Sequence, residues 1–197
     1  MVLNDDVLEF LEHSNMIEGV FDGDSLDQAV LAWQYVTAQE ELTPEVVLET
    51  HRILALHSDL SPDEIGHFRK EQVWIGRREG KPWYAVPDLI LAWCGDWTAM
   101  WEGARYTRDD EERAKVYHIR YEEIHPFIDY NGRSGRLLLN WMRVKMGLPI
   151  LVIREEERFE YFGKQLLIRL SSINYMEGEY ESKYKIVKDS INSYNIF

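Results

Sequence analysis

Hydrophobic residues recur at helical spacing through most of this chain. Residues 25–41 carry apolar side chains every three or four positions, which is the pattern of one face of an α-helix. These side chains are Leu26, Val30, Leu31, Trp33 and Val36. Similar patterns cover residues 43–60, 86–104, 109–124 and 156–170, and a weaker one covers about 178–191. The chain is therefore predicted to be all-α.

Two of these segments begin with helix-start signals. Ser25 precedes the first apolar positions of its segment, so it is a candidate N-cap. Thr43 is followed by Pro44, and this pair is typical of an N-cap and the first helical position. The sequence thus predicts where both helices begin.

Residues 66–87 break the helical pattern. The β-prone pieces "VWIG" and "PWYAV" flank a polar turn, "RREGK", which predicts a small β-hairpin. An isolated hairpin is only marginally stable in water. We therefore expect it to pack against the helices or to pair with another extended segment.

Composition narrows the classes of partner and compartment. A chain of 197 residues with 45% hydrophobic residues can bury one sizeable core. The net charge of −13 argues against nucleic acid as a partner, since phosphate binding needs a basic surface. The N-terminus lacks the basic start of a signal peptide, and no apolar run is long enough to cross a membrane. With a single cysteine, the chain is expected to be cytoplasmic, without a membrane partner.

The stretch "HPFIDYNGRSGR", residues 125–136, combines groups that suit phosphate chemistry. Pro126 should end the preceding helix at His125, and the next helix should begin near Asn131, which can cap it. The free N–H groups of Asn131, Gly132 and Arg133 would then form an anion site. Gly132 lets a phosphate approach the backbone closely.

Charged side chains complete this predicted site. Arg133 and Arg136 are three residues apart, so both can reach phosphate oxygens. Asp129 is a hard oxygen ligand suited to Mg²⁺, and His125 has the intrinsic pKa of a general base. Phe127 is expected to anchor the loop in the core. The combination indicates transfer of a phosphoryl or nucleotidyl group to a hydroxyl. Zinc is a weaker explanation, because no recognisable ligand spacing links His51, His57, His118 and Cys94.

This stretch resembles the signature of the Fic family, H-x-F-x-[D/E]-G-N-G-R-x-x-R. The upstream "GHFR" and "VWIG", within residues 66–76, resemble the start of that family's β-hairpin flap. The resemblance spans about residues 40–170 and implies a Fic-fold helical bundle with a hairpin flap. The matching positions are His125, Phe127, Asp129, Asn131, Gly132, Arg133 and Arg136.

The resemblance also implies an activity, the transfer of AMP from ATP to a Ser, Thr or Tyr hydroxyl of a target protein. His125 would deprotonate the hydroxyl, and Asp129 would hold Mg²⁺. Arg136 would bind the γ-phosphate. The α- and β-phosphates would be bound by Asn131, Gly132 and Arg133. The flap would clamp a target segment by strand pairing through Val73, Trp74, Ile75 and Gly76.

The chain departs from the signature at Tyr130, where the family has glycine. A positive φ at this position would strain a tyrosine, and the side chain could narrow the nucleotide cleft. Doc-type relatives resemble the signature without that glycine, so the fold tolerates a side chain there. Gly132 is retained where the phosphorylating Doc-type members have lysine, which favours AMP transfer.

A second motif, "SNMIEG", resembles the family's inhibitory pattern [S/T]-x-x-x-E-[G/N] at Ser14, Glu18 and Gly19. Residues 1–24 are therefore predicted to be an N-terminal inhibitory segment, and residues 25–197 the Fic domain. Glu18 would pair with Arg136 and occupy the arginine meant for the γ-phosphate.

Other functions stay open at this point. The same site could remove AMP from a modified protein, with Glu18 orienting a water, or could transfer another phosphate-containing group. A different class of function is a catalytically silent Fic fold, altered at Tyr130, that only binds a partner. The sequence leaves open the target protein, self-modification and assembly into a homo-oligomer.

Overall fold

The computed structural model describes residues 4–76, 78–102 and 109–163. Residues 1–152 form one compact unit, and the chain from Ile153 onward belongs to a second one. In the second unit, η2 (Glu155–Glu157) is followed by helical residues 158–163. The rest of the helix predicted for 156–170, and the one near 178–191, lie outside the described residues.

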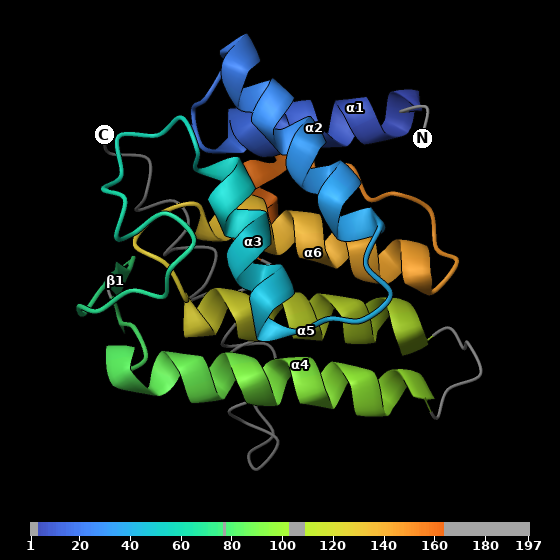
Figure 1. Ribbon diagram of the computed structural model, residues 1–197. Coiled ribbons are helices and arrows are strands. Elements are labelled where there is room, and N and C mark those ends of the chain that lie inside the picture. The colour runs from blue at the N-terminus through green and yellow to red at the C-terminus, as the bar shows by residue number, and fades with distance from the viewer. Residues whose placement is uncertain (1–3, 77, 103–108, 164–197) are drawn as a thin grey trace, which may run out of the picture. The chain divides into compact units, whose positions relative to one another are not determined.

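Helix α6 (Asn131–Lys145) lies at the centre of the first unit. It packs beside α5 (Asp109–Ile124), and α5 in turn packs beside α4 (Val86–Glu102), so that these helices run side by side in Figure 1. The other side of α6 is covered by α1 (Asp5–Ile17), α2 (Gly23–Thr37) and α3 (Pro44–Leu54). The predicted helical bundle is confirmed.

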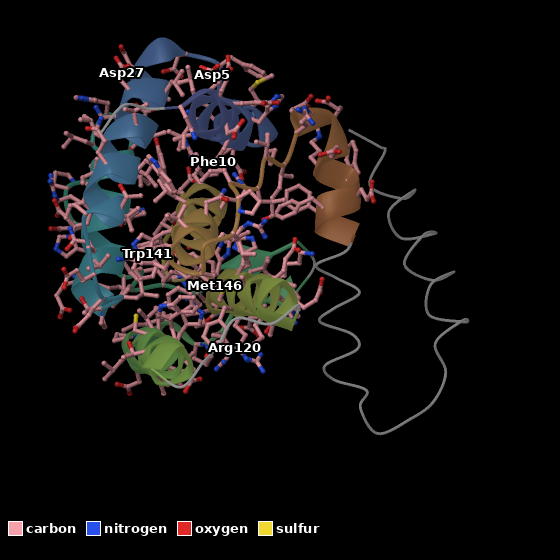
Figure 2. All side chains as sticks on the ribbon, turned by 90° about the vertical axis from the view of Figure 1, so that its right-hand side faces the viewer. Asp5, Phe10, Asp27, Arg120, Trp141 and Met146 are labelled. Atoms are coloured by element: carbon pink, nitrogen blue, oxygen red, sulfur yellow. The ribbon has the colours of Figure 1, made fainter. Side chains whose placement is uncertain are left out.

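The apolar run "LLLNWM" explains why α6 is central. All the residues from Leu137 to Met142 are buried, so this part of the helix has neighbours all round. Figure 2 shows Phe10 and Trp141 in the interior of this unit, with Asp5, Asp27 and Arg120 toward its edge. The motif of residues 125–136 therefore leads directly into the best-packed helix.

The helix-start predictions had different outcomes. Thr43 caps α3 by accepting a hydrogen bond from Val46 N, and Pro44 is its first residue, as predicted. The prediction that Ser25 caps α2 was wrong. Asp22 is the N-cap, and it accepts hydrogen bonds from both the N–H and the hydroxyl of Ser25. A carboxylate three residues before Ser25 therefore caps the helix by binding the N–H of Ser25 itself.

The apolar pattern of residues 25–41 also included one residue that is not in the core. Trp33 and Val36 are buried, but Leu31 is 49% exposed. Two alanines, Ala29 and Ala32, take buried positions on α2 instead. Small side chains there let α2 approach its neighbours closely, whereas Leu31 lies on the outward face.

The hairpin is present, but its second strand lies within residues 77–81, which were predicted to form the turn. β1 (Trp74–Ile75) pairs antiparallel with β2 (Arg78–Glu79). The second predicted β-piece was wrong, because residues 83–85 form the 3₁₀ turn η1 (Trp83–Ala85), which leads into α4. Pro82 stands at the N-cap of that turn. It lacks the N–H needed for a strand ladder and suits a turn entry. Among the described residues, no helix is long and apolar enough to cross a membrane.

Candidate active site

The loop between α5 and α6 begins at His125. α5 ends at Ile124, so the predicted exit of the chain at this histidine is confirmed. His125 has a φ of 50°, in the left-handed region that non-glycine residues seldom adopt. Its N–H donates to Tyr121 O at 3.0 Å, which closes the last turn of α5. The backbone thus turns sharply at the candidate base.

Arg69 fixes this turn from the flap side. Its Nε donates to His125 O at 2.7 Å, and its Nη2 reaches Ile124 O at 3.3 Å. The same guanidinium donates to Glu71 O and Lys81 O, on the two sides of the hairpin. Arg69 is buried, and the carbonyl oxygens replace the water that a buried cation loses. One side chain therefore joins the base of the flap to the loop of His125.

Phe127 anchors the loop in the core, as predicted, because it is fully buried. Its ring stacks on His51 of α3, with the ring centroids 3.7 Å apart. His51 Nδ1 accepts a hydrogen bond from Gly66 N, so Nε2 carries the ring proton in the neutral form. His51 Nε2 lies 3.3 Å from Asp129 O. Burial lowers the pKa of His51 to about 4, so it remains neutral at pH 7.

Asn131 has a different task from the one predicted. It is the first residue of α6 rather than its cap, and Tyr130 takes the N-cap position. The Asn131 side chain instead bonds the backbone of Phe127, accepting from its N–H and donating to its C=O, both at 2.9 Å. An amide has both a donor and an acceptor, so it can close a loop in this way.

Tyr130 adopts the left-handed conformation, with φ 63° and ψ 9°. A side chain in this region is strained by about 1–2 kcal/mol, which is the cost anticipated from the departure from glycine. The Tyr130 ring packs under the guanidinium of Arg133, whose central carbon lies 3.4 Å from the ring centroid. The side chain therefore leans on the start of α6.

Asp129 is the most accessible charged group of the loop, with 62% of its side chain exposed. Its Oδ1 lies 3.6 Å from Arg133 Nη2. Across the described part of the chain, no group of three or more His, Cys, Asp or Glu residues could hold a metal ion alone. A single exposed carboxylate beside a phosphate site fits Mg²⁺, which binds through one or two carboxylates together with substrate phosphates.

The N-terminal end of α6 already faces an anion. A Cβ added at Gly132 would collide with Glu18 Oε1 and would lie 2.9 Å from Arg136 Nη1. The Glu18 carboxylate therefore lies against the backbone of Gly132, where the helix dipole and free N–H groups favour negative charge. The anticipated contact is present, since Arg136 Nη2 donates to Glu18 Oε1 at 2.7 Å.

Ser14 contributes more to this contact than the motif suggests. Arg136 Nε donates to Ser14 Oγ at 3.0 Å, and Nη2 donates to Ser14 O at 2.8 Å. Arg136 is buried, whereas 33% of the Glu18 side chain is exposed. Glu18 Oε1 and two oxygen atoms of Ser14 thus accept hydrogen bonds from the same guanidinium.

Gly19 ends α1 with a φ of 75°. Its N–H donates to Met16 O, and Val20 N donates to Asn15 O, which is the pattern of a glycine C-cap. A residue with a Cβ would be strained at this φ. Ser14, Glu18 and Gly19 therefore work together to direct the end of α1 toward Arg136.

The predicted flap residues lie in and beside β1. Trp74 is 68% exposed, whereas Val73 and Ile75 are half-buried and Gly76 is exposed in the turn. Val73 O accepts from Gly80 N at 2.9 Å, which extends the pairing of the hairpin. In the described part of the structure, β1 pairs only with β2, so its other edge can take a further strand.

Two residues that hold the site were missed from the sequence. His51 was considered only as a metal ligand, and Arg69 only as part of the "GHFR" resemblance. The contact of His51 with Asp129 spans 78 positions of the sequence, and that of Arg69 with His125 spans 56. The available signal was the presence of a histidine on a buried helical face and an arginine before a hairpin, and neither pattern specifies a partner.

The comparisons with known proteins agree with this fold and loop. The model of the Fic/DOC family matches residues 41–142, more than half of the chain. The chain therefore belongs to the Fic/DOC family.

Named relatives are similar over most of this chain. It is 33% identical over 137 residues to protein adenylyltransferase fic-1 of Caenorhabditis elegans, covering 68% of this chain and 25% of that protein. It is 31% identical over 153 residues to protein adenylyltransferase Fic of Drosophila willistoni, covering 72% of this chain and 29% of that protein. The chain thus spans between a quarter and a third of the length of these relatives.

Solved structures show the same fold. The structure of Fic-1 from C. elegans matches with a TM-score of 0.72 at 23% identity, covering 98% of this chain and 63% of that one. The crystal structure of a Fic domain containing signaling protein from Bacteroides thetaiotaomicron matches with a TM-score of 0.71 at 20% identity, covering 82% of this chain and 70% of that one.

Proposed function

We propose that this chain is an autoinhibited protein adenylyltransferase that transfers AMP from ATP to a Ser, Thr or Tyr hydroxyl of a target protein. The observation that carries the proposal is the anion site at the start of α6. Gly132 and Arg136 face a carboxylate there, and the loop of His125 leads into the same helix. The names of the relatives, protein adenylyltransferase, support the same reaction.

The proposed reaction assigns each group a step. His125 takes the proton of the target hydroxyl, whose oxygen forms a bond to the α-phosphorus of ATP. The bond from that phosphorus to the oxygen bridging to the β-phosphate breaks, and pyrophosphate leaves. Gly132 and Arg133 hold the α- and β-phosphates together with the backbone N–H of Asn131. The Asn131 side chain is not assigned to the phosphates, because it is already bonded to Phe127.

Asp129 is the residue that would hold Mg²⁺. When bound, Mg²⁺ neutralises part of the phosphate charge. The exposed Asp129 carboxylate and the nearby Arg133 guanidinium offer opposite charges at one end of α6. A metal could therefore approach Asp129 while the phosphates approach the arginine.

Inhibition follows from what Arg136 binds. The γ-phosphate of ATP would need the guanidinium that now donates to Glu18 and Ser14. Charge-assisted hydrogen bonds in a buried setting contribute about 1.5–3 kcal/mol each, so ATP must displace a strong competitor. We propose that wild-type protein binds ATP weakly or in an unproductive pose while α1 is docked.

The partner of this reaction is a target protein with an extended segment. The free edge of β1 supports strand pairing with that segment, which would present its hydroxyl toward His125. Trp74, exposed on β1, offers the segment an apolar contact.

The test compares three variants, Glu18→Gly, Arg136→Ala and the double variant. Each is incubated with Mg²⁺ and ATP labelled at the α-phosphate, alone and with cell lysate, and intact mass is measured. Glu18→Gly should raise transfer about tenfold or more, because it removes the competitor and keeps Arg136. Arg136→Ala should give no gain, and the double variant should resemble it, since both residues act through one contact.

Glu12→Ala is the matched control, because Glu12 is an exposed carboxylate on the same helix. It should leave transfer unchanged. Equal transfer by wild type and Glu18→Gly would contradict the inhibition. ATP binding without any transfer by Glu18→Gly would favour the silent binding module.

Removal of AMP is the second candidate, and the position of Glu18 at the α6 end favours it specifically. A carboxylate against Gly132 could orient a water toward an AMP-bearing side chain. In that case Glu18→Gly should slow the release of AMP from modified protein instead of increasing its attachment.

A further inference from the structure

Tyr130 is held in a conformation that its residue type disfavours. Within the described residues, it and His125 are the non-glycine residues with a positive φ. Its carbonyl accepts hydrogen bonds from Ser134 N at 2.9 Å and Ser134 Oγ at 2.8 Å. Tyr121 OH lies 2.8 Å from the same Ser134 hydroxyl. The backbone at Tyr130 is therefore fixed from the core, and this fixes where its ring can go.

The ring is packed on more than one side. The His51 and Tyr130 rings are nearly perpendicular, with ring centroids 6.0 Å apart and an angle of 87° between the planes. His51 is itself fixed by its stack on Phe127 and its bond from Gly66 N. Tyr130 thus presents a rigid aromatic face toward the first turn of α6.

Arg133 lies over that face. Its guanidinium carbon is 3.4 Å from the Tyr130 ring centroid, a stacking distance at which the cation–π attraction is favourable. Arg133 is 7% exposed, and its Nε is buried without a hydrogen-bond partner among the described residues. Stacking uses the face of a guanidinium and leaves the N–H groups in its plane able to donate. The stack therefore orients Arg133 without consuming its donors.

We propose that Tyr130 is a positioning residue, an aromatic platform that holds the Arg133 guanidinium ready for the phosphates of the nucleotide. This inference rests on the proposed function of the site. In it, Tyr130 favours nucleotide binding instead of narrowing the nucleotide cleft. Glycine at this position has no ring, so Arg133 would have to be ordered by the ligand itself. Ordering a long side chain before binding raises affinity.

The experiment measures the dissociation constant of Mg²⁺–ATP by calorimetry, with all variants made in the Glu18→Gly background so that Arg136 is available. Tyr130→Phe keeps the ring and should bind ATP within about twofold of its parent. Tyr130→Asn tolerates the left-handed backbone without a platform, and should bind about tenfold more weakly. Tyr130→Gly, which also removes the strain, should show the same loss.

A double-mutant cycle separates positioning from a general structural effect. Arg133→Ala should weaken ATP binding, and adding Tyr130→Gly should then change little, because the platform has nothing left to hold. Melting temperatures without nucleotide check folding, and a shift within about 4 °C is expected for Tyr130→Gly.

Each outcome decides the inference. Unchanged or tighter binding by Tyr130→Gly would overturn it, and so would an equal loss with and without Arg133. If the Glu18→Gly parent does not bind ATP at all, the proposed function fails first. A parent that binds ATP equally well with tyrosine, asparagine or glycine leaves the proposed function intact and removes only the platform.

Discussion

His125 is a residue whose backbone and side chain serve different purposes. Its carbonyl accepts from Arg69, a buried cation that also bonds the carbonyls flanking the flap. This leaves the imidazole half-buried at the mouth of the loop. The strained φ of 50° is thus held by hydrogen bonds of the main chain.

The His125 side chain is the proposed general base. His125→Ala should reduce AMP transfer about 100-fold or more, because a general base acts on the incoming hydroxyl. ATP binding should stay nearly unchanged, since the phosphate-binding groups belong to α6. Labelling with α-phosphate-labelled ATP and calorimetry in the Glu18→Gly background measure the two effects.

His57→Ala is the control, because His57 is an exposed histidine outside the site. Near-normal transfer by His125→Ala would contradict the proposed mechanism. Loss of both transfer and ATP binding would show that the histidine is needed for the loop itself.

Helix α3 supports the loop between α5 and α6 through His51. His51 stacks on Phe127 and lies against the carbonyl of Asp129. Burial is the main cause that lowers its pKa to about 4, and the nearby Arg133 and His67 lower it further, whereas Asp129 raises it. The helix therefore presents a neutral imidazole to the back of the loop.

This low pKa predicts a dependence of stability on pH. The unfolded chain protonates His51 near pH 6.5, but the folded protein resists protonation until about pH 4. Between these values the unfolded state binds more protons, so the free energy of unfolding should fall as the pH falls, by up to about 3 kcal/mol. Urea unfolding at several pH values between 7.5 and 4 measures it.

Other titrating groups will contribute, so the comparison of variants decides this prediction. His51→Gln should remove part of the decrease between pH 6.5 and 4, and exposed His57→Gln should not. Parallel pH profiles for wild type and His51→Gln would show that this histidine is not the buried neutral group inferred here.

Local sequence predicted some element boundaries and missed others. The Thr43–Pro44 start and the exit at His125 were correct because both depend on the chemistry of neighbouring residues. The prediction of Ser25 as the N-cap of α2 was wrong because two residues able to cap lie three positions apart, and Asp22 accepts the capping hydrogen bond. Residues 82–86 look β-prone, but their position between the hairpin and α4 imposes a tight turn.

For the whole molecule, the docking of α1 decides whether Glu18 reaches Arg136. α1 packs on α2 and α6 through its buried face. The rings of Phe10 and of Trp33 on α2 meet edge to face, with ring centroids 5.7 Å apart. A hydrophobic contact away from the site therefore contributes to holding the carboxylate against Gly132.

Weakening this contact should act on stability and transfer together. Phe10→Ala should lower the free energy of unfolding by about 3 kcal/mol through the cavity that it leaves. It should also raise transfer, because α1 leaves Arg136 more often. Urea unfolding and labelling measure the two effects.

Leu8→Ala is the matched control, since Leu8 is on the same helix and 42% exposed. It should change neither quantity appreciably. A destabilised Phe10→Ala protein with wild-type transfer, alongside an activated Glu18→Gly, would show that the docking of α1 does not limit release.

The order of residues along the chain was enough to predict the helical class, the presence of a hairpin, the exit of the chain at His125 and the residues of the two motifs. Spacing of apolar positions and the chemistry of adjacent residues are local properties, and they persist in any fold that the chain adopts. The tertiary structure alone decided that His51 and Arg69 support the loop, that Tyr130 carries Arg133, and that Asn131 closes the loop instead of capping α6. The contacts of His51 and Arg69 join elements far apart in the chain, and those of Tyr130 and Asn131 depend on a left-handed residue and a closed loop. They depend on how the helices pack, which no local pattern of residues specifies.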